Sequence, residues 1–152
     1  MRRRQIDTKF WIDEKVRAAS WLEKQVMLHL LTRAEMLTVG AITTTVSSMR
    51  NLLNGTGRNF VTPEFPLIGE KHITRALNSI KRRGIIEVMN SADTTVFFLN
   101  FLSYQDWSST VVRSWPRMID EQVPQGFIQA VIRETCVEYC HAKMKALPDE
   151  WA

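Results

Sequence analysis

The clearest pattern of apolar and polar positions in the chain is helical. Between residues 71 and 84, the apolar residues recur at intervals of three and four, which places them on one face of an α-helix. These residues are Ile73, Ala76, Leu77 and Ile80. Gly84 follows the last periodic position, where a glycine commonly ends a helix. The polar face carries Lys71, Thr74, Arg75, Asn78, Lys81 and Arg82.

Earlier segments predict two further helices and a strand. Ser20 and Glu23 have capping-box spacing and open a helix that we expect to end near Arg33. Its buried stripe is Leu22, Val26, Met27, Leu30 and Leu31. The β-branched residues of 37–46 indicate a short strand. A short helix capped by Ser47 or Ser48 then runs to residues 52–53 and stops at 54–55.

The segments that flank the basic helix differ in character. Residues 56–69 contain three glycine or proline breakers before Gly69, and they predict a loop with at most a short strand near 60–62. After the helix, two apolar runs at 85–89 and 94–99 flank the polar residues 90–93, which is a β-hairpin pattern. Residues 5–19 are expected to be an irregular lead-in whose aromatic residues dock on the core.

The last third of the chain predicts a helical extension. Residues 101–124 form a connector in which a helix is expected to begin near Pro116 rather than run through it. A long helix over 127–146, ended by the Leu147-Pro148 pair, then follows. Its apolar stripe is Ile128, Val131, Ile132, Cys136, Tyr139 and Cys140. We expect the C-terminal helices to serve oligomerisation or partner contact, because Phe127, Val131 and Tyr139 form part of an apolar stripe that must be buried on something.

The order helix, strand, helix, helix, hairpin is that of a winged helix-turn-helix. The fold class predicted is therefore mainly α (α+β), with a small β-wing and a C-terminal helical extension. The predicted domain covers residues 1–105, with a loop insertion at 56–69, and the extension covers 106–152.

Composition and charge narrow the class of protein. The 152 residues are 45% hydrophobic and 24% charged, which suits one globular domain. No apolar run reaches membrane-spanning length, and the N-terminal MRRRQID is no secretory signal, so a cytoplasmic location with no membrane partner is expected. Residues 1–84 hold fifteen Lys and Arg against seven Asp and Glu (+8), whereas residues 85–152 hold five against nine (−4). The basic half favours a polyanionic partner.

The sequence resembles the N-terminal winged-helix domains of phage replication-initiator and replisome-organiser (primosomal, helicase-loading) proteins. The similar segments are IDTKFW at 6–11, EKQVMLHLLT at 23–32, TVGAI at 38–42, AL at 76–77 and KRRGII at 81–86. In that family these are the docked arm, helix 1, strand 1 and the recognition helix leading into the wing. The family joins helices 2 and 3 by a short turn, whereas residues 56–69 intervene here.

The third helix, at 71–83, is predicted to enter the major groove of double-stranded DNA, and the alternative is a solvated basic face. Arg75 and Asn78 suit base edges, since Arg pairs with guanine and Asn with adenine. Lys71, Lys81 and Arg82 suit phosphates, and Arg83 the helix C-terminus. The candidate DNA-binding residues are Lys71, Thr74, Arg75, Asn78, Lys81, Arg82 and Arg58.

Several other features are also interpreted. The hairpin turn carries Asp93 and no cation, which disfavours a phosphate-binding wing. The 56–69 loop offers Arg58 and Asn59 for backbone contacts, an apolar partner surface, or packing on its own domain. The arginines at 2–4 are a minor-groove arm or merely solvated. The tryptophans at 11, 21 and 107 are expected in the core or a domain junction rather than stacked on bases.

No catalytic or cofactor motif is present, so an enzyme is not expected, and neither is a cofactor or a metal. Cys136 and Cys140 are interpreted as buried structural thiols, with metal ligands as the alternative. The predicted role is origin recognition or replisome assembly, with a homodimer and a replication protein such as a helicase or loader as candidate partners. The alternatives are a transcriptional repressor on the same scaffold, and a protein-interaction adaptor or inhibitor that does not bind DNA.

Overall fold

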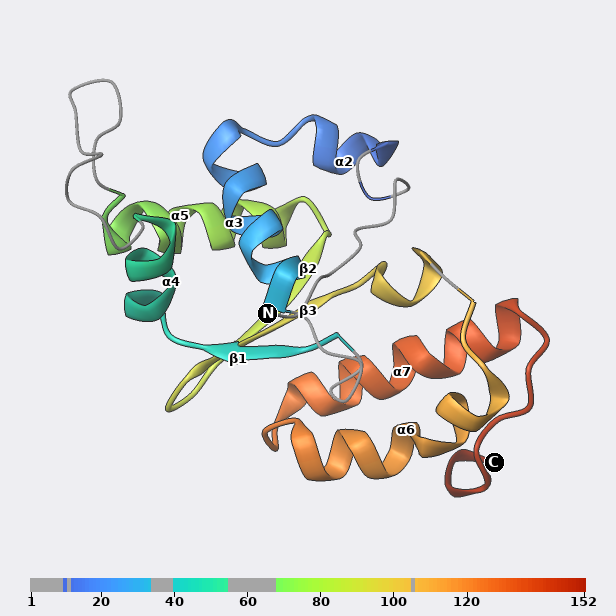
Figure 1. Ribbon diagram of the computed structural model, residues 1–152. Helices are drawn as coiled ribbons and strands as arrows, with labels where there is room; N and C mark the ends of the chain where they lie inside the picture. Colours follow the sequence, from blue (N-terminus) through green and yellow to red (C-terminus); the bar gives the residue numbers. More distant parts are fainter. Residues whose placement is uncertain (1–9, 11, 34–39, 55–67, 105) are drawn as a thin grey trace.

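A computed structural model describes residues 10, 12–33, 40–54, 68–104 and 106–152 (Figure 1). Over these residues the chain forms six α-helices and a three-stranded antiparallel sheet, an α+β arrangement. The elements are α2 (Glu14–Arg17), α3 (Trp21–Arg33), β1 (Ile42–Thr44), α4 (Val46–Leu53), α5 (Glu70–Arg82), β2 (Ile86–Asn90), β3 (Thr94–Phe98), α6 (Ser109–Gln122) and α7 (Phe127–Ala142). Short 3-10 turns lie at Phe101–Tyr104 and Asp149–Trp151. From α3 to β3, the order helix, strand, helix, helix, hairpin is the predicted one.

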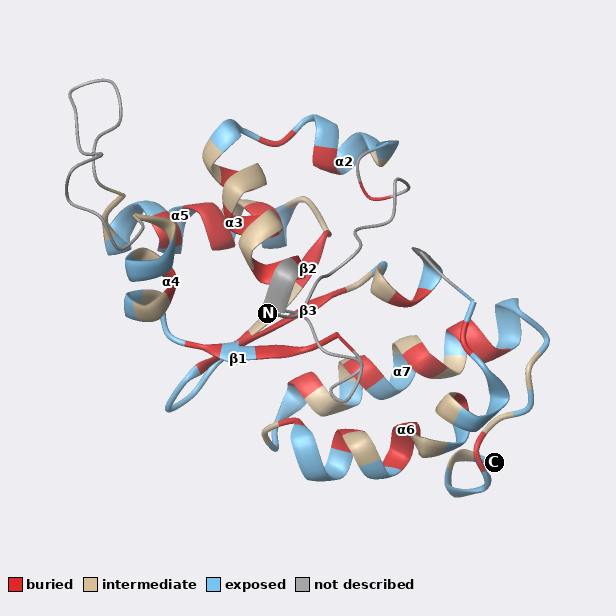
Figure 2. Ribbon diagram, in the orientation of Figure 1, coloured by how far each residue is buried: buried red, intermediate tan, exposed pale blue. Residues whose placement is uncertain are grey.

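The sheet has the order β1-β3-β2, and β3 is its central strand. All five residues of β3 are buried, because helices cover both faces of the sheet (Figure 2). Side chains alternate between the two faces of a strand. Val96 and Phe98 pack into the core with α3 and α5, whereas Phe97 packs into the core with α6 and α7. The chain is therefore built in three layers, with the hairpin in the middle (Figure 1).

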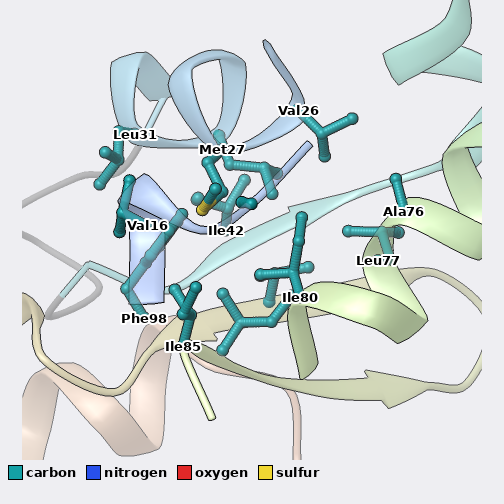
Figure 3. Packing of buried hydrophobic residues seen from close by; sticks show 14 of the residues in the cluster. Val16, Val26, Met27, Leu31, Ile42, Ala76, Leu77, Ile80, Ile85 and Phe98 are labelled. Carbon is teal, nitrogen blue, oxygen red and sulfur yellow. The ribbon is translucent and has the colours of Figure 1, made fainter. Parts of the chain in front are cut away.

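The first core lies between α3, α5 and the sheet (Figure 3). Met27 of α3, Ile80 of α5 and Phe98 of β3 are fully or almost fully buried there. Each such side chain contributes about 1.5–3 kcal/mol when removed from water. The predicted stripe of α5 is confirmed, since Ile73, Ala76, Leu77 and Ile80 are all buried. In α3, Val26, Met27, Leu30 and Leu31 are buried as predicted, whereas Leu22 is only partly buried against the same core. This packing turns the polar face of α5 outward.

The second core lies between the sheet and the extension. Trp107, Trp115 and Tyr139 stack edge to face in sequence, with ring centroids 5.9 and 5.7 Å apart. The stripe of α7 is buried here, against the chain's own sheet and α6, so the expectation that it is left for a partner is wrong for most of its length. Phe127, at the start of α7, remains 51% exposed.

The two cysteines are buried in this second core, as predicted. Burial raises the pKa of both the Cys136 and the Cys140 thiol, so each stays neutral at pH 7. Within the described ranges there is no group of three or more side chains that could hold a metal ion. No helix in the same ranges is long and apolar enough to cross a membrane.

Helix α6 runs through Pro116, contrary to the prediction that a helix begins there. Ser108 caps it instead, and its hydroxyl accepts a hydrogen bond from the backbone N–H of Val111 at 3.3 Å. A proline in a helix interior costs about 3 kcal/mol. Burial of Trp115 and Ile119 on the same face is worth about 1.5–3 kcal/mol each, which offsets that cost.

Three smaller expectations also differ from the structure. Thr45, rather than Ser47 or Ser48, caps α4, and its hydroxyl accepts from the N–H of Ser48 at 3.0 Å. Trp21 is 67% exposed rather than packed, although Trp107 is buried as predicted. The lead-in contains the short helix α2, with buried Phe10 and Val16 docking it on the core. The predictions for Arg58, for the other residues of 55–67, for the arginines at 2–4 and for the tryptophan at 11 lie outside the described residues.

Helix α7 ends at Ala142, four residues before its predicted end at residue 146. Met144 adopts a left-handed conformation with φ of 54°, and the N–H of Lys145 bonds to the carbonyl of Cys140 at 2.8 Å. This turn brings the Lys145 ammonium within 3.0 Å of the Asp106 carboxylate and into contact with the Trp107 carbonyl. The helix therefore ends in a local left-handed turn, and a long-range contact of Lys145 accompanies that turn.

Replacing Met144 with glycine is expected to stabilise the protein. The left-handed conformation costs a residue with a side chain about 1–2 kcal/mol, and glycine avoids this cost. Glycine also raises the conformational entropy of the unfolded chain, which offsets part of the benefit, so the expected net increase in the free energy of unfolding is about 0.5–1 kcal/mol. Met144 is 94% exposed, so little packing is lost. Urea unfolding measures the change, and Met144→Ala is the control, expected to give no gain.

Candidate nucleic-acid interface

The solvent face of α5 is a narrow stripe of polar residues. At 100° per residue, Lys71, Arg75, Asn78 and Arg82 fall within an arc of about 60°. All four are exposed, and the buried residues Ile73 and Ile80 lie on the opposite side. We call these four residues the α5 stripe. Thr74 and Lys81, also exposed, lie on the flank of the stripe that faces β2.

The cations of α5 differ in whether a carboxylate neutralises them. Lys71, Arg75 and Arg82 make no ion pair with any residue in the described parts of the chain. Lys81 does, because its ammonium lies 3.3 Å from the Glu87 carboxylate of β2. Arg83 does as well, through Glu23 of α3. Thus Lys71, Arg75 and Arg82 are available to bind an anion, whereas Lys81 must first break its ion pair with Glu87.

Glu23 fastens α5 to α3 from inside the protein. Its side chain is almost entirely buried, with Oε1 accepting from the Ser79 hydroxyl at 2.8 Å and Oε2 accepting from Arg83 Nε at 2.9 Å. Burial alone would raise the pKa of this carboxyl. The hydrogen bonds from Ser79 and Arg83, together with the charge of Arg83, outweigh burial and hold the pKa of Glu23 below its ordinary value of 4.5. The carboxylate is therefore ionised at pH 7 and links α3 to the C-terminal part of α5.

Glu23 also completes the predicted capping box at the start of α3. The N–H of Glu23 donates to the Ser20 hydroxyl at 3.2 Å, and the N–H of Ser20 donates to the Glu23 carboxylate at 3.4 Å. The spacing of these two residues revealed the cap. It did not reveal that the same carboxylate binds Ser79 and Arg83, which lie 56 and 60 residues away.

An asparagine clamp joins the end of α4 to the start of α5. Asn54 Nδ2 donates to the carbonyl of Ile68 at 2.9 Å, and the N–H of Ile68 donates to Asn54 Oδ1 at 2.7 Å. The two hydrogen bonds hold the end of α4 next to the start of α5, and the two helices pack against each other. Arg50 of α4 adds an ion pair of 3.8 Å to Glu70 of α5.

The C-terminus of α5 ends in a Schellman motif. The N–H of Gly84 bonds to the carbonyl of Lys81 at 2.9 Å, and the N–H of Ile85 bonds to the carbonyl of Ile80 at 3.4 Å. Gly84 adopts φ of 75°, the left-handed region, as its position after the periodic residues predicted. The motif turns the chain sharply from α5 into β2.

Replacing Gly84 with alanine is expected to lower the free energy of unfolding by about 0.5–1 kcal/mol. A Cβ in the left-handed conformation costs about 1–2 kcal/mol, and the lower entropy of alanine in the unfolded chain offsets part of that cost. Space is not the cause, since the nearest atom to such a Cβ is the Lys15 ammonium, at an ordinary contact distance of 3.4 Å. Gly84→Asn is the matched variant, and it should lose less because asparagine tolerates this conformation. Chemical denaturation of both variants checks the order; equal losses would point to a steric cause.

The hairpin presents carboxylates and no cation. Glu87 and Asp93 are the charged residues of 86–98, and residues 90–93 at its tip are exposed. The tip is held by the N–H of Ser91, which donates to the carbonyl of Asp93 at 3.0 Å. The predicted turn is confirmed, with residues 91–93 between the strands. A phosphate next to this hairpin would meet negative charge.

Lys15 is a cation near α5 that sequence reasoning missed. It belongs to α2, and its ammonium lies 3.4 Å from the point that a Cβ on Gly84 would occupy. Lys15 is exposed and makes no ion pair with a described residue. Figure 1 shows α2 above the turn from α5 to β2. A single lysine 69 residues before Gly84 carries no spacing signal, so only the tertiary structure brings it to this helix end.

No protein-family model matches the sequence, and comparisons with curated proteins and with solved structures give no match either.

Proposed function

We propose that this chain is a winged-helix protein that binds double-stranded DNA, with α5 in the major groove. The proposal is supported by the order of elements and by a sheet order, β1-β3-β2, in which the hairpin follows the third helix. The observation that carries it is the α5 stripe, whose three cations Lys71, Arg75 and Arg82 are exposed and have no carboxylate partner among the described residues.

The dimensions of α5 suit the groove. The stripe runs from Lys71 to Arg82, about 16 Å along the helix at 1.5 Å per residue. The major groove is about 12 Å wide and admits one α-helix. Arg75 and Asn78 lie in the middle of the stripe, where base edges would be, and Lys71 and Arg82 lie at its ends, where the phosphate backbones would be. Arginine and asparagine are the residues that read guanine and adenine in bidentate fashion.

The biological role we propose is phage replication initiation or replisome assembly, and it follows from the sequence resemblance alone. A transcriptional repressor would use the same stripe. The two roles are distinguished by the DNA bound: iterated origin sequences in the first case, the protein's own promoter in the second.

A non-DNA-binding adaptor is the second candidate function. It is favoured by the hairpin, whose charged residues, Glu87 and Asp93, are both acidic. On this alternative the α5 stripe meets acidic side chains of a partner protein.

The test is a titration of the whole chain against labelled duplex DNA at about 50 mM and about 200 mM salt. Two or three phosphate contacts predict a loss of affinity of roughly 10- to 40-fold between these conditions, because each contact releases condensed counterions. Absence of binding at the lower salt would reject DNA binding and favour the adaptor. Binding whose affinity does not fall with rising salt would also count against the proposed contacts to phosphates.

A further inference from the structure

We propose that the duplex is held on the α2 side of α5, with Lys15 contacting the phosphate backbone, and that the β2–β3 hairpin repels DNA instead of contacting it. The inference rests on the proposed function. It adds Lys15 of α2 as a second contact region, which attracts phosphate, and it makes the β2–β3 hairpin a region that repels phosphate.

The hairpin flank is negative. Glu87 Oε1 lies 3.3 Å from Lys81 Nζ, and the same oxygen accepts a hydrogen bond from the N–H of Val88 at 3.3 Å. These contacts hold the carboxylate against α5. Asp93 adds a second negative charge at the exposed tip. Glu87 occupies Lys81, the cation on that flank, and the Asp93 charge disfavours an approaching phosphate.

The α2 side offers a cation that has no carboxylate partner among the described residues. Arg83 is already satisfied by Glu23, and of the two exposed cations of α2 it is Lys15 whose ammonium lies beside Gly84. The negative end of the α5 macrodipole lies at the same place and favours a cation. The neighbouring Asp13 carboxylate is occupied at the start of α2, with Oδ1 accepting from the N–H of Lys15 at 2.9 Å and Oδ2 accepting from Asn100 Nδ2 at 3.4 Å. Lys15 is exposed, and its ammonium lies beside Gly84.

Arg82 and Lys15 together then grip one backbone near the C-terminal end of α5. Arg82 belongs to the last turn of the helix, and Lys15 lies beside the glycine that follows it. The duplex is displaced toward α2 as a result, away from Glu87. This placement predicts that neutralising one flank weakens binding and neutralising the other strengthens it.

Duplex binding by wild type, Lys15→Ala and Glu87→Gln tests the inference. Lys15→Ala is expected to weaken affinity roughly 3- to 10-fold and to reduce the magnitude of the salt slope by about 1. Glu87→Gln is expected to tighten binding, because it frees Lys81 for phosphate. Lys143→Ala, which removes an exposed lysine just after α7, is the control and should match wild type.

Unchanged affinity in Lys15→Ala, or weaker binding in Glu87→Gln, overturns the inference. If wild type still binds the duplex in that case, the proposed DNA-binding function stands. No binding by wild type overturns both. Lysine acetylation of the wild-type protein, followed by mass spectrometry, removes any dependence on how the variants fold. Duplex DNA should protect Lys15 and Lys71 but leave Lys143 reactive; an unprotected Lys15 beside a protected Lys71 overturns the inference.

Discussion

Replacing Arg75 and Arg82 together with alanine is expected to weaken duplex DNA binding about 100-fold. A bidentate arginine contact to a base is worth about 1–3 kcal/mol, and loss of a phosphate contact adds a further several-fold. Both side chains belong to the α5 stripe and make no ion pair with a described residue. Fluorescence anisotropy with a labelled duplex, at one fixed salt concentration, measures the effect.

The control is a second double variant with the same change of charge. Arg117→Ala with Arg133→Ala removes two exposed arginines from α6 and α7, on the opposite side of the sheet. It should retain nearly full affinity, since its residues lie far from α5. Equal losses of affinity in the two double variants would show that net charge, rather than the α5 stripe, drives binding. Unchanged affinity in Arg75→Ala with Arg82→Ala would favour the adaptor.

The single variants should differ from each other. Arg75→Ala is expected to relax sequence preference, because Arg75 would contact bases, whereas Arg82→Ala should weaken binding to every sequence alike. Lys81→Ala should have the smallest effect of the three, because the Lys81 ammonium already pairs with Glu87.

Glu23→Ala is expected to lower the free energy of unfolding by about 2 kcal/mol. Its removal leaves Arg83 without a partner and the Ser79 hydroxyl without an acceptor, and such groups cost about 1–3 kcal/mol when buried. Because Arg83 is about one-third exposed, water compensates for part of the loss, and the value expected is below that of a fully buried pair. Urea unfolding at about pH 7 measures it.

The same carboxylate makes stability depend on pH. The pKa of Glu23 in the folded protein is lowered, so its contribution is complete above the ordinary value of 4.5 and is lost as pH falls through the lowered pKa. Glu23→Gln should remove this part of the acid sensitivity, so that its unfolding free energy falls less than that of wild type between neutral and strongly acidic pH. Glu121→Gln, at an exposed position of α6, is the control. Identical acid profiles for Glu23→Gln and wild type would contradict the assignment.

Much of the local structure could be predicted from the sequence. The apolar spacing of 73–80, the capping pair Ser20 and Glu23, and Gly84 each depend on residues within a few positions of one another. Their geometry is therefore readable from period and residue type. The hairpin was predictable for the same reason. The interior proline of α6 was misinterpreted because burial of Trp115 and Ile119, a tertiary effect, offsets its local cost.

The sequence by itself determined that α5 has a basic face, that it is the third helix of the predicted order, and that an acidic hairpin follows it. Only the tertiary structure decided which cations of that face are free. Glu87 takes Lys81, Glu23 takes Arg83, and Lys15 comes to the helix end from α2. Except for the Lys81–Glu87 pair, these partners lie tens of residues apart. Ion pairing depends on distance in space, which the periodicity of a single element does not encode.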